Sequence, residues 1–129
     1  MLTATMVSFF DPDVESESYL MVSKPPANMK PGIPLVEQVA DQMISTSQTL
    51  YKDYQVRAGS RENITVNGSA AIRLIVDHKA LQSGKESVQY MYFLETANKV
   101  GYLNFQTSRD NFEKMRPIFD SIAFSVHLQ

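Results

Sequence analysis

The chain has 129 residues, of which 43% are hydrophobic and 20% charged, and its formal net charge is -2. This length is near the commonest size of one domain, and the composition excludes both disorder and a fibrous repeat. We therefore expect a single domain, residues 1–129. Because lysine and arginine form no run and the net charge is slightly negative, we expect no nucleic-acid partner.

The chain contains no cysteine, which excludes disulfides, thiolate metal sites and thiol nucleophiles. No apolar stretch approaches the length of a membrane-spanning helix, and the first six residues lack the features of a secretion signal. As written, the sequence predicts a soluble chain in an unknown compartment. One alternative is that a leader or first strand preceded Met1, which would place the protein outside the cytoplasm or on a lipid anchor; otherwise it is cytoplasmic.

Strand-forming residues begin the chain. Thr3–Phe10 is β-branched and aromatic and Ser18–Lys24 is a second apolar run, which predicts two strands joined by the polar loop Asp11–Glu17. Four prolines between Lys24 and Pro34 then predict an extended connection. Apolar residues at helical spacing predict an amphipathic helix from Pro34 to about Tyr51.

The middle of the chain predicts two hairpins. Asn67-Gly68 lies between two β-forming runs, Ile64–Val66 and Ser69–Val76, and favours a type I′ turn. The strands Val88–Glu95 and Lys99–Thr107 predict a second hairpin. We therefore expect a mainly antiparallel sheet.

Apolar residues occupy both faces of one predicted strand. Alternation places Tyr90, Tyr92 and Leu94 on one face, and Met91 and Phe93 on the other. A strand that is apolar on both faces is buried on both, so we expect it at the centre of the sheet.

The C-terminal segment predicts a helix that starts near Ser108 and Asp110. Its apolar stripe consists of Phe112, Met115, Phe119 and Ile122. The pattern does not decide whether Pro117 kinks this helix or separates two shorter ones. Ala123–Val126 is predicted to form a final short strand. Together the elements predict an α+β fold in which helices cover both faces of the sheet, an α/β/α sandwich.

This layout resembles the PsbP-like fold family, which includes the photosystem extrinsic subunit PsbP, the Ran-binding Mog proteins and bacterial DcrB-type proteins. The resemblance rests on the first helix at Pro34–Val39, the hairpin at Ile64–Ala71 and the closing segment Phe112–Phe124. It implies docking to other proteins or to a membrane complex, without a common enzyme activity or cofactor. Members carry an opening strand and a Pro-x-x-Trp segment ahead of the equivalent of Met1, whereas this chain has no tryptophan.

Few residues suggest a catalytic, binding or modification site. Asp77-His78-Lys79 is the one place where a histidine adjoins other ionisable groups, and it is read either as an acid-base site or as the solvated entrance of a loop. Ser83-Gly84-Lys85 lacks the remaining residues of a phosphate loop and is read as a turn tip. Asn63-Ile-Thr65 and Asn67-Gly-Ser69 fit the glycosylation pattern, which arises often by chance.

Acidic residues at alternate positions, Asp11, Asp13, Glu15 and Glu17, are spaced like the start of a calcium loop. The glycine and the final glutamate of such a loop are missing, so we expect a solvated acidic turn and no metal.

The leading hypothesis is a non-enzymatic domain that docks on a protein partner, with His78, Lys79 and Lys85 of the loop 77–87 as the interaction surface. The first alternative is a small-ligand carrier with a pocket between helix and sheet. Tyr90, Met91 and Tyr92 are expected to line that pocket, although core packing explains the tyrosines equally well. The second alternative is a hydrolase that uses His78 beside a hydroxyl nucleophile and an orienting group.

Overall fold

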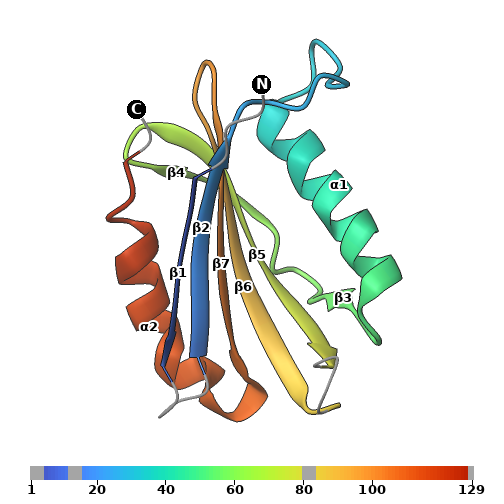
Figure 1. Cartoon of the computed structure of the whole chain (residues 1–129), viewed down its shortest axis with the longest axis vertical. Coiled ribbons are helices and arrows are strands. Elements are labelled where there is room, and N and C mark those ends of the chain that lie inside the picture. Colours follow the sequence, from blue (N-terminus) through green and yellow to red (C-terminus); the bar gives the residue numbers. More distant parts are fainter. Residues whose placement is uncertain (1–4, 12–15, 80–83, 128–129) are drawn as a thin grey trace.

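The computed structural model describes residues 5–11, 16–79 and 84–127. It forms one sheet with a helix on each face (Figure 1). The elements in chain order are β1 (Thr5–Asp11), β2 (Ser16–Ser23), α1 (Leu35–Leu50), β3 (Gln55–Val56), β4 (Glu62–Val66), β5 (Ser69–Lys79), β6 (Glu86–Glu95), β7 (Val100–Ser108), the 3-10 turn η1 (Arg109–Asn111) and α2 (Phe112–Ala123).

The sheet has seven strands, six of them in the order β1-β2-β7-β6-β5-β3, while β4 also pairs with β5. Every described pairing is antiparallel. The structure therefore confirms the α+β class and the helices on both faces. None of the described helices has the length and apolar character needed to cross a membrane.

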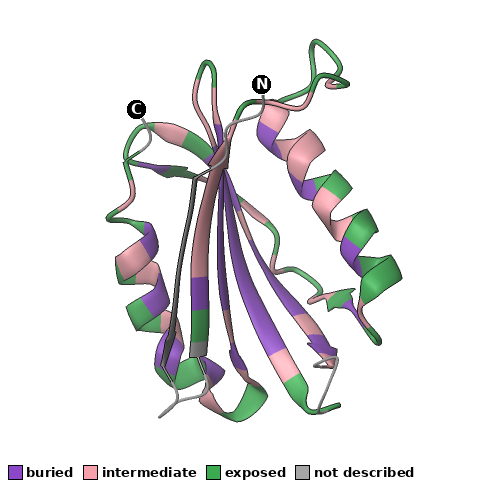
Figure 2. Cartoon of the chain, in the orientation of Figure 1, coloured by how far each residue is buried: buried purple, intermediate pink, exposed green. Residues whose placement is uncertain are grey.

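Strand β6 is central, as its two apolar faces predict. Tyr90, Tyr92 and Leu94 belong to the core beneath α2, whereas Met91 and Phe93 belong to the core beneath α1. Each of the five is at most 1% exposed, and Figure 2 shows buried residues along the middle strands. Helix α1 is amphipathic and buries Val36 and Ala40 against this sheet, and α2 buries Phe112, Met115 and Phe119.

The hairpin between β4 and β5 has the predicted turn. Asn67 has a φ of 49° and Gly68 a φ of 83°, as a type I′ turn requires at both central positions. The Asn67 side-chain Nδ2 also donates to the carbonyls of Phe124 at 2.9 Å and Val126 at 2.7 Å. The turn therefore holds the segment that follows α2.

The C-terminal prediction is partly wrong. Helix α2 continues through Pro117 to Ala123, and Pro117 lies on the exposed side of the helix, where its ring has room. The predicted strand Ala123–Val126 does not form. The N–H groups of Phe124, Ser125 and Val126 bond to the preceding turn at 2.9 to 3.1 Å, so they are not available to a sheet.

Candidate functional site

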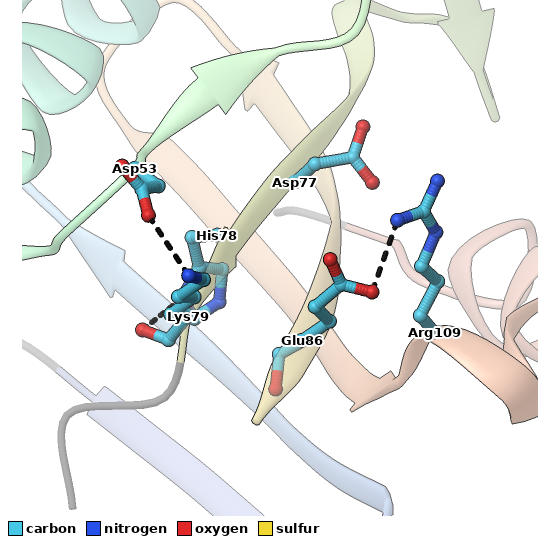
Figure 3. A pocket seen from close by; sticks show the side chains of 7 residues that line it. Asp53, Asp77, His78, Lys79, Glu86 and Arg109 are labelled. Atoms are coloured by element: carbon cyan, nitrogen blue, oxygen red, sulfur yellow. Dashed lines mark hydrogen bonds and ion pairs between the residues drawn. The ribbon is translucent and has the colours of Figure 1, made fainter. Parts of the chain in front are cut away.

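A polar hollow of about 300 Å³ lies at the end of β5 and β6 (Figure 3). Its lining residues come from the segment after α1, the ends of the two strands, and η1: Asp53, Asp77, His78, Lys79, Glu86, Ser87 and Arg109. The β5–β6 register sets His78 opposite Ser87 and Lys79 opposite Glu86. The pairing of β5 with β6 therefore brings most of these residues together, and only Asp53 and Arg109 come from other elements.

Two exposed ion pairs border the hollow, and both are drawn in Figure 3. Lys79 Nζ lies 3.4 Å from Asp53 Oδ2, and Arg109 Nη1 lies 3.0 Å from Glu86 Oε2. The four side chains are 44 to 62% exposed. Exposed pairs of this kind are each worth about 1 kcal/mol or less, so these groups can exchange partners at low cost.

Asp77 is held by Arg57 from the α2 side of the sheet. Arg57 Nε donates to Oδ2 at 3.0 Å, and Nη2 donates to Oδ1 at 2.8 Å. The hydrogen bonds from Arg57 lower the pKa of the Asp77 carboxyl. Asp77 therefore stays ionised and oriented, but it faces away from the imidazole of its neighbour His78.

His78 lies inside the protein, so the reading of this segment as a solvated loop entrance is wrong for His78. Its residue is 3% exposed, and the rings of Tyr51 and Tyr54 lie 5.0 and 6.1 Å from its ring. Nδ1 is 3.1 Å from the Lys79 carbonyl, which can only accept, so Nδ1 carries the proton. Burial lowers the pKa of His78, and the imidazole is neutral.

The arrangement required of a hydrolase is not assembled in the described residues. Ser87 is opposite His78 in the ladder, but His78 Nε2 is buried and has no hydrogen-bond partner. The group that orients Nδ1 is the backbone carbonyl of Lys79, whereas the nearby carboxylate of Asp77 binds Arg57. Nε2 is thus not positioned to take a proton from the hydroxyl.

The three residues predicted as an interaction surface differ in their accessibility. Lys79 borders the hollow, and Lys85 is exposed next to Gly84, which has a φ of 68°. His78 offers almost no exposed area. Docking through Lys79 and Lys85 stays a prediction.

Other sequence candidates remain predictions. Asp13 and Glu15 of the acidic segment, and Ser83 of the Gly84 turn, lie outside the described residues. Among the residues that the structure does describe, no group of three or more histidines and carboxylates is placed to hold a metal ion. Asn63 and Asn67 of the two glycosylation patterns are both exposed.

Sequence reasoning missed a polar cluster in the core beneath α2. Tyr90 Oη donates to Asp120 Oδ1 at 2.6 Å, and Tyr92 Oη donates to the same oxygen. Arg73 Nη1 donates to Tyr92 Oη at 3.3 Å, and Nη2 donates to Glu62 Oε2 at 2.8 Å. The sequence left open whether Tyr90 and Tyr92 are core residues or part of a recognition surface. They are core residues whose hydroxyls are hydrogen-bonded. No local pattern links them to Asp120, because the contact exists only once α2 packs on β6.

A second hollow, of about 310 Å³, lies between α1 and the β2–β7 half of the sheet. It is lined mainly by apolar groups: Met21, Ser23, Pro26, Val39, Gln42, Met43, Thr46, Val100 and Tyr102. The predicted carrier pocket was therefore placed at the wrong residues. Tyr90, Met91 and Tyr92 are packed in the core and line neither hollow.

No family model and no curated protein matches this sequence. Solved structures do match its fold. PA94 from Pseudomonas aeruginosa, a protein of unknown function, is 14% identical with a TM-score of 0.70, and the match covers 100% of this chain and 85% of PA94. LpqN, involved in cell envelope biogenesis of Mycobacterium tuberculosis, is 15% identical with a TM-score of 0.64, over 90% of this chain and 64% of LpqN.

A third match is CyanoP, the cyanobacterial PsbP of Synechocystis sp. PCC 6803. It is 12% identical with a TM-score of 0.62, and the match covers 99% of this chain and 92% of CyanoP. These identities are too low to transfer residue roles, but the agreement extends over almost the whole chain. The resemblance inferred from the sequence is confirmed at the level of architecture: this chain has the PsbP-like fold.

Proposed function

We propose that this chain is a non-enzymatic docking domain that binds a protein partner through the polar hollow at the end of β5 and β6. The observation that carries the proposal is the pair of exposed ion pairs at its border, Lys79–Asp53 and Arg109–Glu86. A partner with charged side chains can replace one member of each pair, because such exposed pairs contribute little to the stability of the free domain.

The hollow also has a rigid frame. Lys79 and Glu86 are opposite each other in the β5–β6 ladder, and Asp77 is fixed by two hydrogen bonds from Arg57. Charges attached to a rigid scaffold recognise a complementary surface at a small entropic cost. The mixture of both signs favours a protein surface over a polyanion.

Two further observations support a binding role over catalysis. His78 Nε2 is buried behind the surface, where it cannot act on a substrate without rearrangement. LpqN is described as involved in cell envelope biogenesis and CyanoP as a cyanobacterial PsbP, and neither is named as an enzyme. By analogy, we include in the proposal a partner that belongs to an envelope or membrane-associated complex.

The test is a comparison of the tagged domain with a charge-reversed variant, Lys79→Glu with Arg109→Glu, in affinity capture from native extract. A control with the same charge change, Lys24→Glu with Lys114→Glu, alters two exposed lysines that do not line the hollow. We expect a protein that the wild type and the control retain and the reversed variant loses. Equal retention by all three proteins would contradict the assignment of this surface.

The hollow beneath α1 supports a second candidate, a carrier of a small apolar ligand. Its volume of about 310 Å³ is at the lower end of ligand pockets, and Met21 and Met43 can adapt to different shapes. Filling it with Val39→Trp should abolish any ligand-induced rise in melting temperature while leaving capture of the protein partner unchanged. If Val39→Trp instead abolished capture of the protein partner and left the ligand-induced rise in melting temperature unchanged, docking on this face would be favoured.

A further inference from the structure

One asparagine in the chain differs chemically from the others. Asn67 is the only asparagine that is followed by a glycine, and asparagine is among the thermolabile residues. The backbone nitrogen of the next residue can attack the side-chain carbon Cγ, and glycine hinders this attack least because it has no Cβ and adopts many backbone conformations. Asn67 and Gly68 are both exposed, so water reaches the turn that they form.

The reaction that this pair of residues allows is deamidation. A bond forms between Gly68 N and Asn67 Cγ, the Cγ–Nδ2 bond breaks, and Nδ2 leaves as ammonia together with the amide proton of Gly68. Water then adds to a carbonyl carbon of the resulting cyclic imide and opens the ring, which gives aspartate or isoaspartate. The net reaction consumes water, releases ammonia and replaces a neutral amide with a carboxylate.

In the folded domain, the amide of Asn67 joins two distant parts of the chain. Asn67 Nδ2 donates to the carbonyl oxygens of Phe124 at 2.9 Å and Val126 at 2.7 Å, and Figure 1 shows the chain after α2 leading to the hairpin between β4 and β5. Phe124 also packs edge-on against Tyr92, with 6.1 Å between the ring centroids, and Val126 packs on the core beneath α2. The amide therefore helps to hold the segment 124–126 against that core.

Neither product of deamidation can make these two hydrogen bonds. The amide supplies both donors, whereas an ionised carboxylate only accepts, and it would face two carbonyl oxygens that also only accept. Isoaspartate in addition inserts a methylene group into the backbone of a two-residue turn, across which Val66 is paired with Ser69. Deamidation therefore removes the contact that holds the segment 124–126 at the hairpin.

The same two hydrogen bonds slow the reaction in the folded state. Nδ2 must leave and Cγ must turn toward Gly68 N, whereas the bonded amide is held in a turn with φ values of 49° at Asn67 and 83° at Gly68. The amide is released for reaction when the segment 124–126 detaches, which is a local opening and does not require global unfolding. Reaction during such an opening is irreversible, because ammonia is lost and the carboxylate cannot donate.

From these observations we propose that Asn67 is a modification site, at which deamidation permanently releases the segment 124–126 from the hairpin. Each opening of the segment exposes the amide to reaction, and each reaction prevents the segment from closing again. Asn67 does not line the polar hollow, so this proposal goes beyond the docking function and is independent of it.

The first experiment incubates the full chain at mildly alkaline pH, in buffer and in guanidinium chloride, and locates new carboxylates by peptide mass spectrometry. We expect product at Asn67 in both samples, formed at least about fivefold more slowly in the folded protein because two hydrogen bonds must first break. Asn63 is the internal reference and should stay unmodified, because the β-branched Ile64 follows it. No product at Asn67 in the folded protein, or equal rates in the two samples, would overturn the proposal.

Two truncations test whether the reaction is coupled to opening of the segment 124–126. Phe124→Ala removes the ring contact with Tyr92 and should accelerate deamidation of Asn67 by roughly twofold to tenfold, because the detached state becomes more populated. Ile118→Ala shortens a residue of similar exposure on α2 and should leave the rate unchanged. Equal rates of deamidation in the two variants would contradict the coupling.

The consequence of the modification is tested with Asn67→Asp, which is one of its products, and with Asn67→Gly, which accepts a positive φ but lacks the amide. The N–H groups of Ser125 and Val126 donate to the preceding turn at 3.1 Å, and we expect their hydrogen exchange to be faster in both variants. Exchange in β6 should stay slow, which shows that the domain remains folded. Wild-type exchange at these two N–H groups in either variant would overturn the assignment of the amide as the group that holds the segment.

Discussion

Removing the carboxylate of Asp120 should destabilise the domain far more than its position on a surface helix suggests. Asp120 Oδ1 accepts hydrogen bonds from Tyr90 and Tyr92 and lies 3.6 Å from Arg73 Nη1. Both tyrosines are at most 1% exposed, and burial raises the pKa of each hydroxyl, so both stay protonated donors.

The expected decrease in the free energy of unfolding is calculated from these contacts. A hydrogen bond to a charged acceptor contributes about 1.5 to 3 kcal/mol, and Asp120→Ala removes two. Because the Asp120 side chain is 31% exposed, water replaces part of the loss, and we expect a decrease of about 2 to 4 kcal/mol in the free energy of unfolding. Tyr92→Phe alone should cost about 1 to 2 kcal/mol.

The assay is equilibrium unfolding in urea of four proteins: the wild type, Asp120→Ala, Tyr92→Phe and the double variant. If the hydroxyl and the carboxylate act together, the double variant loses about 1 to 2 kcal/mol less than the sum of the single losses. Asp110→Ala, an exposed carboxylate in η1, is the control and should change the free energy by less than about 0.5 kcal/mol. A loss below about 1 kcal/mol for Asp120→Ala, or strict additivity, would refute this account of the cluster.

Three further predictions concern His78, the hairpin turn at Asn67, and Phe93. Burial lowers the pKa of His78 from its usual value of 6.5, so the unfolded chain binds a proton at this histidine more readily than the folded domain does. The free energy of unfolding should therefore decrease as pH falls through 6.5, by at most about 1.4 kcal/mol per pH unit. The free energy of unfolding, measured in urea between pH 7.5 and 5.5, should depend less steeply on pH for His78→Gln than for the wild type, whereas the exposed His127→Gln should behave like the wild type. Asn67→Ala should cost about 1 to 3 kcal/mol in thermal unfolding, because alanine disfavours a φ of 49° and two hydrogen bonds to the C-terminal segment are lost; a smaller cost would mean that the segment is held elsewhere. Phe93→Ala should cost about 3 to 5 kcal/mol with an unchanged dependence on urea concentration, whereas a changed dependence would indicate loss of two-state unfolding.

Features that depend on neighbouring residues could be predicted well. The two apolar faces of β6 follow from alternation over residues 88–95, and the type I′ turn follows from Asn67-Gly68, since only a few residue types adopt positive φ at low cost. The helix from Leu35 and its buried stripe follow from spacing alone. The end of α2 was misjudged, because the backbone N–H groups of the β-forming residues after it donate locally to the carbonyls of Asp120 and Ile122.

The candidate site could be predicted only in part. Asp77-His78-Lys79 was recognised as a group of ionisable residues, and Lys79 does border the polar hollow. The hollow itself also needs Asp53 and Arg109, which come from different elements and share no motif with that segment.

The sequence by itself determined most of the strands and helices, apart from the strand predicted at Ala123–Val126, and which side chains of β6 face each core, because these properties depend on local dihedral preferences and on the period of apolar residues. The tertiary structure alone decided that His78 lies against Tyr51 and Tyr54, that Asp120 receives two tyrosine hydroxyls, and that β1 and β3 are at opposite ends of the main strand order among the described residues. Each of these depends on how separate elements pack, and packing brings together residues whose spacing in the chain carries no signal of their contact.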